Sequence, residues 1–71
     1  MTSYELFIVI HTINGQVHET YSSTIREMLI NKLPKDVISA ADCRDLLHYG
    51  SHKEHIGGEK HCFYFNIINT I

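Results

Sequence analysis

Two short apolar runs near the N-terminus are separated by a turn signal. Leu6–Ile10 is rich in β-branched and aromatic residues, which predicts a strand, and Val17–Tyr21 predicts a second strand. Asn14-Gly15 lies between them and favours a type I′ turn, because both of these residues adopt a positive φ readily. The sequence therefore predicts an N-terminal antiparallel hairpin.

Counting outward from the turn assigns the side chains of this hairpin to two faces. Ile13 then faces Gln16, and His11 faces His18. Two protonated imidazoles at the latter position would repel each other and weaken the hairpin below about pH 6.5. The more apolar face is the expected core face, and it carries Leu6, Ile8, Ile10, Val17 and Tyr21. The expected uncovered face carries Phe7, Val9 and one row of the last strand.

Two helices are predicted in the middle of the chain. Thr24 and Glu27 have the spacing of a capping box, and apolar residues follow at helical spacing until Pro34 ends the segment. Ser39, with an acidic residue three positions later, predicts the start of a second helix, and Gly50 marks its end. The apolar side of the second helix consists of Cys43, Leu46 and Leu47.

The rest of the chain completes the predicted fold. Ser51–Lys60 is polar and contains Gly57-Gly58, which predicts a loop, whereas Cys62–Ile68 is aromatic and β-branched and predicts the last strand. The order β-β-α-α-β predicts an α+β fold in one compact domain of residues 1–71. We expect a small three-stranded sheet, made of the N-terminal hairpin and the C-terminal strand, with two helices packed on one face.

Composition and charge exclude several classes of protein. The 71 residues carry six Lys plus Arg and eight Asp plus Glu, for a net charge of −2 and a pI near 6.3. Nucleic-acid-binding domains typically have a pI above about 9, so nucleic acid is not an expected partner, and binding through the aromatic last strand is only a third hypothesis. No run approaches the roughly 20 apolar residues of a membrane span, and no secretory signal is expected. Two cysteines are too few for a disulfide framework, so we expect a cytoplasmic protein with reduced thiols.

Histidine is unusually frequent, with six in the chain, and four of these lie between residues 48 and 61. Imidazole and thiolate are the ligands that zinc prefers. The candidate zinc ligands are His48, His52, His55, His61 and Cys62. Their spacing matches no standard zinc motif, so we expect no cofactor and keep a zinc-binding domain as the alternative hypothesis.

The sequence contains no arrangement typical of catalysis. Cys62 directly follows His61, but neighbouring residues of a strand point to opposite faces, so this imidazole is badly placed to take the proton of the thiol. A domain of this size also has little room for an active-site cleft. We therefore expect no enzymatic activity.

The leading hypothesis is a small interaction protein. We expect a regulator or inhibitor that docks on a larger partner protein and occludes it, of the general kind made by phages and other mobile elements. A sheet with helices on one face leaves apolar residues on the other, which is typical of proteins that bind a partner or a second copy. Homodimerisation is therefore expected as well. The candidate contact residues are His18, Thr20, His52, Lys53, His55, Lys60 and Tyr64.

Overall fold

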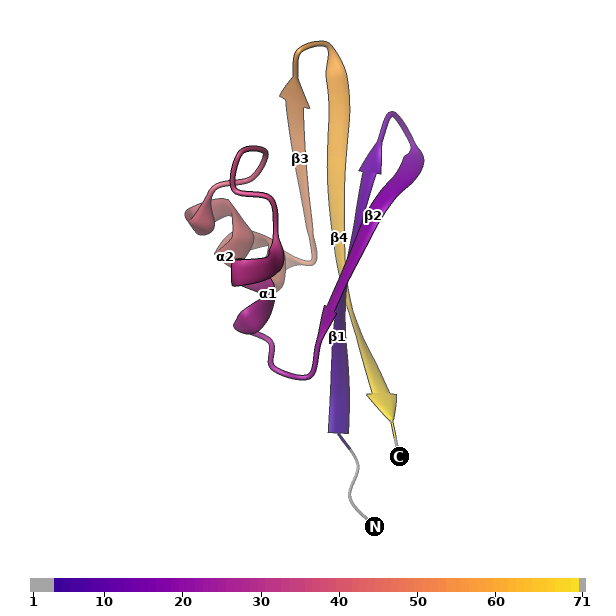
Figure 1. Ribbon diagram of the computed structural model, residues 1–71, viewed down its shortest axis with the longest axis vertical. Coiled ribbons are helices and arrows are strands. Elements are labelled where there is room, and N and C mark those ends of the chain that lie inside the picture. The colour runs from indigo at the N-terminus through magenta and orange to yellow at the C-terminus, as the bar shows by residue number, and fades with distance from the viewer. Residues whose placement is uncertain (1–3, 71) are drawn as a thin grey trace.

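The computed structural model describes residues 4–70, which form two helices and four strands. The elements in chain order are β1 (Tyr4–Ile13), β2 (Gln16–Ser23), α1 (Met28–Lys32), α2 (Ala40–Tyr49), β3 (Ser51–Ile56) and β4 (Glu59–Thr70). The strands form one antiparallel sheet of order β2-β1-β4-β3, and both helices lie on the same side of it (Figure 1). The α+β class is confirmed, but the sheet has four strands rather than the three predicted.

The additional strand is β3, which lies in the segment predicted as a loop. Gly57 and Gly58 have φ values of +56° and +82° and join β3 to β4. Positive φ at two successive residues is what a type I′ hairpin turn requires, and glycine adopts it without strain. β3 is an edge strand with mostly exposed side chains, so its sequence is polar and lacks the apolar signal of a buried strand.

The N-terminal hairpin forms at the predicted turn, but its register contains a β-bulge. His11 pairs with Glu19 instead of His18, because one extra residue of β2 lies opposite β1 at this point. A shift of one residue exchanges the faces of all side chains beyond it. Tyr21 therefore lies on the same face as Val9, its partner across the two strands.

The helices cover the face of the sheet opposite to the one predicted. Val9 and Phe63 are fully buried beneath them, and Phe7 and Phe65 pack against the same core. This side is called the helix face below. The other side, called the open face, carries the residues of β1 that were predicted as core, namely Leu6, Ile8 and Ile10. The prediction was wrong because it compared the two faces of the hairpin alone, whereas the aromatic residues of β4 add more apolar area to the helix face.

Helix α2 begins and ends as predicted. The Ser39 hydroxyl accepts a hydrogen bond from the Asp42 amide at 3.2 Å, and Gly50 closes the helix in the left-handed conformation with φ of +93°. The predicted apolar side faces the core, because Cys43, Leu46 and Leu47 are all buried.

Helix α1 is shorter than predicted. The capping box of Thr24 does not form, since the helix starts after Glu27, whose side chain makes no capping hydrogen bond. Five residues are too few for a stable isolated helix, so the packing of Leu29 and Leu33 into the core holds α1 in place. Neither of the two described helices is long and apolar enough to cross a bilayer.

The assignment of the two faces can be tested on neighbouring aromatic residues. Phe63→Ala leaves a cavity in the core, and we expect the free energy of unfolding to fall by about 3–5 kcal/mol. Tyr64 lies on the open face and is 44% exposed. Tyr64→Ala is expected to cost about 1 kcal/mol or less. Urea unfolding followed by circular dichroism measures both values, and equal losses would contradict the assignment.

Candidate functional site

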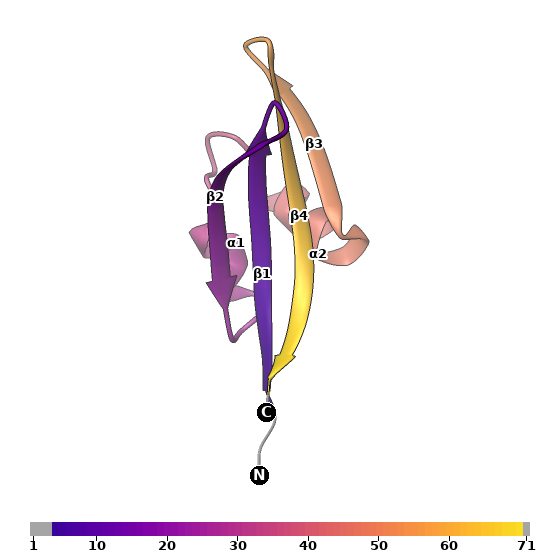
Figure 2. The same ribbon diagram turned by 90° about the vertical axis from the view of Figure 1, so that its right-hand side faces the viewer.

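The open face is the candidate interaction surface. Figure 2 looks onto it, with both helices behind the sheet. An apolar stripe follows the two central strands on this face, where Asn66 opposite Ile8 and Thr12 opposite Cys62 are polar. The stripe consists of Leu6, Ile8, Ile10, Cys62, Tyr64 and Ile68. The members on β1 are half-buried by their neighbours, whereas Tyr64 and Ile68 are 44% and 43% exposed. No element of residues 4–70 lies over this stripe.

Polar side chains border the apolar stripe on both outer strands. Register places Thr20 and Ser22 on the open side of β2, and Lys53 and His55 on the open side of β3. Five of the seven candidate contact residues therefore share the open face: Thr20, Lys53, His55, Lys60 and Tyr64. The other two, His18 and His52, lie on the helix face.

A cluster of histidines lies at one end of the helix face. His11 and His61 are 2% and 5% exposed, and Nε2 of His11 lies 3.0 Å from Nδ1 of His61. The His11 ring stacks on Phe63 with 4.2 Å between ring centroids, and His18 approaches edge-on at 5.2 Å. The sequence predicted a contact of His11 with His18 but missed the hydrogen bond with His61, which depends on the pairing of β1 with β4.

The hydrogen bond of this buried pair restricts its protonation. One ring must donate and the other accept, so both cannot be fully protonated. Nε2 of His61 lies 3.4 Å from a carboxylate oxygen of Glu59, which favours a proton on that nitrogen and leaves Nδ1 to accept from His11. Nδ1 of His11 is buried without a partner, so a proton there would lack an acceptor. Burial lowers the pKa of His11, and the neighbouring His61 and His18 lower it further.

The five residues predicted as zinc ligands do not converge on one point. His48 is exposed on α2, and His55 is exposed on the open side of β3. His61 belongs to the buried histidine pair, and Cys62 points to the opposite face of β4. The structure thus separates them into different surfaces of the sheet.

Within residues 4–70, a different group of three potential metal ligands does lie together. It consists of Asp42, His52 and Glu54, whose ligand atoms are all within 4.8 Å of one another. Nε2 of His52 lies 3.8 Å from Asp42 and 3.7 Å from Glu54, and it is buried without a hydrogen-bond partner. Asp42 comes from the first turn of α2, whereas His52 and Glu54 are two residues apart on β3 and therefore face the same side.

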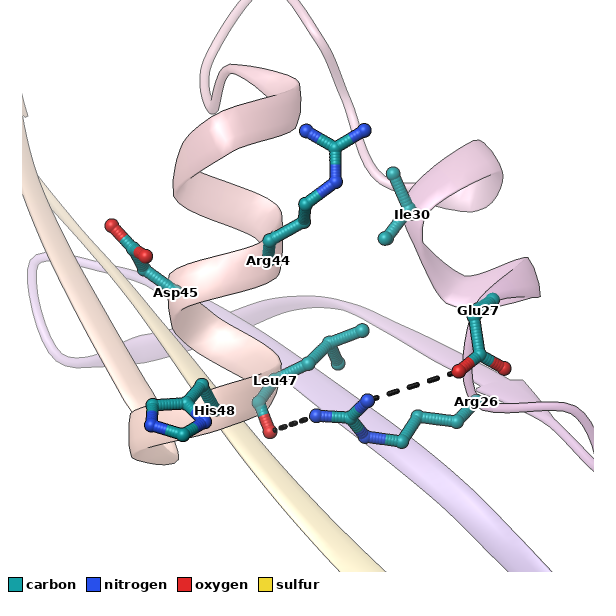
Figure 3. Close-up of a pocket in the computed structure, with 7 residues that line it drawn as sticks. All are labelled: Arg26, Glu27, Ile30, Arg44, Asp45, Leu47 and His48. Atoms are coloured by element: carbon teal, nitrogen blue, oxygen red, sulfur yellow. Dashed lines mark hydrogen bonds and ion pairs between the residues drawn. The ribbon is translucent and has the colours of Figure 1, made fainter.

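A pocket of about 420 Å³ lies between α1 and α2 (Figure 3). The guanidinium of Arg26 donates a hydrogen bond to the Leu47 carbonyl at 2.8 Å and lies 3.8 Å from Glu27. Carbonyls in the last turn of a helix lack partners within the helix, so this contact stabilises the end of α2. The arginine is therefore engaged in joining the two helices. The pocket is lined by Arg26, Glu27, Ile30, Arg44, Asp45, Leu47 and His48.

Neither cysteine is placed like a catalytic nucleophile. Cys43 is fully buried in the core, and burial raises the pKa of its thiol, which lowers the reactive thiolate fraction. Cys62 is 5% exposed, between Thr12 and Lys53 on the neighbouring strands. The two cysteines form no disulfide.

Comparisons of the chain with protein-family models, with curated proteins and with solved structures find no match.

The buried histidine pair makes stability depend on pH. Histidine in an unfolded chain has a pKa near 6.5, and the pKa of His11 is lower in the folded protein, so below about pH 6.5 the unfolded state binds more protons. We expect the free energy of unfolding to be lower at pH 5.5 than at pH 7.5, with His11 contributing at most about 1.4 kcal/mol. His11→Phe should reduce this difference, because it keeps a ring on Phe63 that does not titrate.

The exposed His55 provides the control for this prediction. His55→Asn removes an imidazole that has no part in the buried pair, so it should keep the wild-type pH dependence. Urea unfolding at both pH values measures the difference for each variant. A wild-type protein that is equally stable at pH 5.5 and pH 7.5 would contradict a neutral buried pair.

Proposed function

We propose that the protein is a non-enzymatic interaction module of the cytoplasm, which docks the open face of its sheet on a larger protein and thereby regulates or inhibits it. The observation that carries this proposal is the apolar stripe in the centre of a sheet whose open face is covered by no element of residues 4–70. Apolar side chains gathered on one uncovered face of a sheet are typical of surfaces that bind a partner. Cys43 and Cys62 are both buried and form no disulfide, and a cytoplasmic location would keep such thiols reduced.

The dimensions of the open face support this proposal. β1 has 10 residues. At about 3.3 Å per residue this gives a length of about 33 Å, and four strands about 4.8 Å apart give a width of about 19 Å. The face therefore offers roughly 600 Å², compared with about 800 Å² per partner in a standard specific interface. An interface formed by this face alone would therefore have an area at the lower end of the range for specific protein complexes.

Photo-crosslinking from two tyrosine positions tests which surface binds. The photoreactive residue p-benzoylphenylalanine is placed at Tyr64 on the open face or, as the control, at Tyr49 on α2, which is 75% exposed. In lysate of the cells that naturally produce the protein, we expect one dominant adduct from position 64 and none from position 49. Denaturing electrophoresis and mass spectrometry identify the adduct.

Two results of this experiment would count against the proposal. The same adducts from both positions, or no adduct from position 64, would contradict docking through the open face. An adduct of twice the mass of the chain would show that the open face binds a second copy of the protein, and it would support a homodimer instead of a larger partner.

Zinc binding at Asp42, His52 and Glu54 is the second candidate function. Zinc binds nitrogen and oxygen ligands at about 2.0–2.2 Å, which places two tetrahedral ligands about 3.4 Å apart. The imidazole nitrogen lies 3.8 Å and 3.7 Å from the two carboxylates, so small side-chain movements would bring all three to an ion. A water molecule would complete the tetrahedron.

Native mass spectrometry with added zinc sulfate tests this second function. We expect one zinc ion per wild-type chain and a higher melting temperature in zinc, because an ion that binds only the folded state stabilises it. Asp42→Asn and Glu54→Gln should lose both effects, whereas Asp45→Asn, on an exposed position of the same helix, should keep them. Binding of zinc to the Asp42→Asn protein with unchanged affinity would contradict this site.

A further inference from the structure

Charged side chains are divided unevenly between the two faces of the sheet. Register places Lys53, His55 and Lys60 on the open face, and all three are exposed. The carboxylates of the strands lie on the helix face and belong to Glu5, Glu19, Glu54 and Glu59. The remaining carboxylates are in the segment between β2 and β3 and belong to Glu27, Asp36, Asp42 and Asp45. Within residues 4–70, the open face therefore carries no carboxylate.

The three basic residues gather at one corner of the open face. His55 and Lys60 are cross-strand partners on β3 and β4. Lys53 lies two residues before His55 on β3, opposite Cys62 of the apolar stripe. β3 is the strand at the right of Figure 2. In the sequence, Glu54 and Glu59 are neighbours of Lys53 and Lys60, which suggests that the carboxylates neutralise the lysines. Side chains alternate along the strands, however, so both glutamates lie on the helix face. No ion pair of Lys53 or Lys60 occurs within the described residues.

This arrangement limits what can cover the open face. Lysines at the border of a contact attract anionic groups on the occupant and repel cationic ones, so an occupant with anionic groups at this corner is favoured. A second copy would bring another open face, which offers lysines and no carboxylates. Nucleic acid is anionic, but bases bind on aromatic side chains, and Tyr64 is the one aromatic residue of the stripe. An acidic protein surface fits both the charge and the apolar centre.

We infer that the partner is a different protein whose docking surface is an apolar patch bordered on one side by aspartate or glutamate carboxylates, which pair with Lys53 and Lys60. The inference rests on the proposed function, because it specifies what the open face docks on. The lysines sit at the border of the contact, where charge complementarity determines specificity and the rate of association.

Carbodiimide crosslinking tests the inference directly. The reagent activates a carboxylate, and a lysine amine in contact with it displaces the activating group to form an amide, with release of the corresponding urea. We expect mass spectrometry to find Lys53 or Lys60 joined to an aspartate or glutamate of the same protein that position 64 captures by photo-crosslinking. Amides formed only through Lys32 or Lys35, which lie outside the open face, would overturn the inference.

Charge reversal gives an independent measurement. Lys53→Glu and Lys60→Glu should each reduce the yield of the position-64 photo-adduct by about tenfold, and Lys53→Gln by less, because a like charge repels the acidic border. Arg44→Glu makes the same change of charge on the exposed side of α2 and should leave the yield within about twofold. Circular dichroism melting curves verify that each variant is folded.

The outcomes separate the inference from the proposed function. If position 64 still captures a protein while neither lysine forms an amide and charge reversal has no effect, the acidic border is wrong and docking through the open face stands. If position 64 captures nothing, both fail. Amides between ¹⁵N-labelled and unlabelled copies of this chain would overturn the inference in favour of a homodimer, and an adduct lost after nuclease treatment would overturn it in favour of nucleic acid.

Discussion

The pairing of β1 with β4 is the interaction on which the rest of the structure depends. It joins the two ends of the chain along the centre of the sheet, with Val9 opposite Phe65 and His11 opposite Phe63. A shift of one residue in this register would exchange the helix face and the open face of β4. The same pairing brings His11 to His61 across 50 positions of sequence, and it carries β3 into the sheet as the hairpin partner of β4. The core, the histidine pair and the open face are thus consequences of one register.

Local signals were sufficient to predict part of this fold. The turn at Asn14-Gly15 and both ends of α2 depend on a few neighbouring residues, and they form as predicted. The capping box at Thr24 is a local signal that failed, because α1 is held by core contacts rather than by its cap. β3 was not predicted because its residues are mostly polar and give no clear alternation of apolar and polar positions. Gly57-Gly58 between two extended segments is nevertheless a hairpin signal.

The face assignment and the buried histidine pair could not be predicted locally. The bulge at His18 changes the face of Tyr21, and nothing in the residues around the turn predicts an extra residue there. His61 was grouped with the histidines near it in sequence, whereas its contacts are with β1 and with Glu59. The molecule extends 48 Å along its longest axis, so its central strands run beyond the two short helices. At one such end His11 closes the core by stacking on Phe63, and His61 stacks in turn on His11, which explains how two polar rings come to be buried.

The outer strands give a reason why association should use the open face rather than the edges of the sheet. Edge strands attract other chains through their unpaired backbone groups, and proteins suppress this with short strands, lysines and bulges. Here β3 has only six residues and carries Lys53, and β2 is interrupted by the bulge at His18. The apolar stripe has no comparable protection along the central strands, where Asn66 and Thr12 are the polar residues on the open side. The two edges thus carry features that oppose strand pairing while the apolar centre stays accessible, and the proposed docking through the open face relies on this difference.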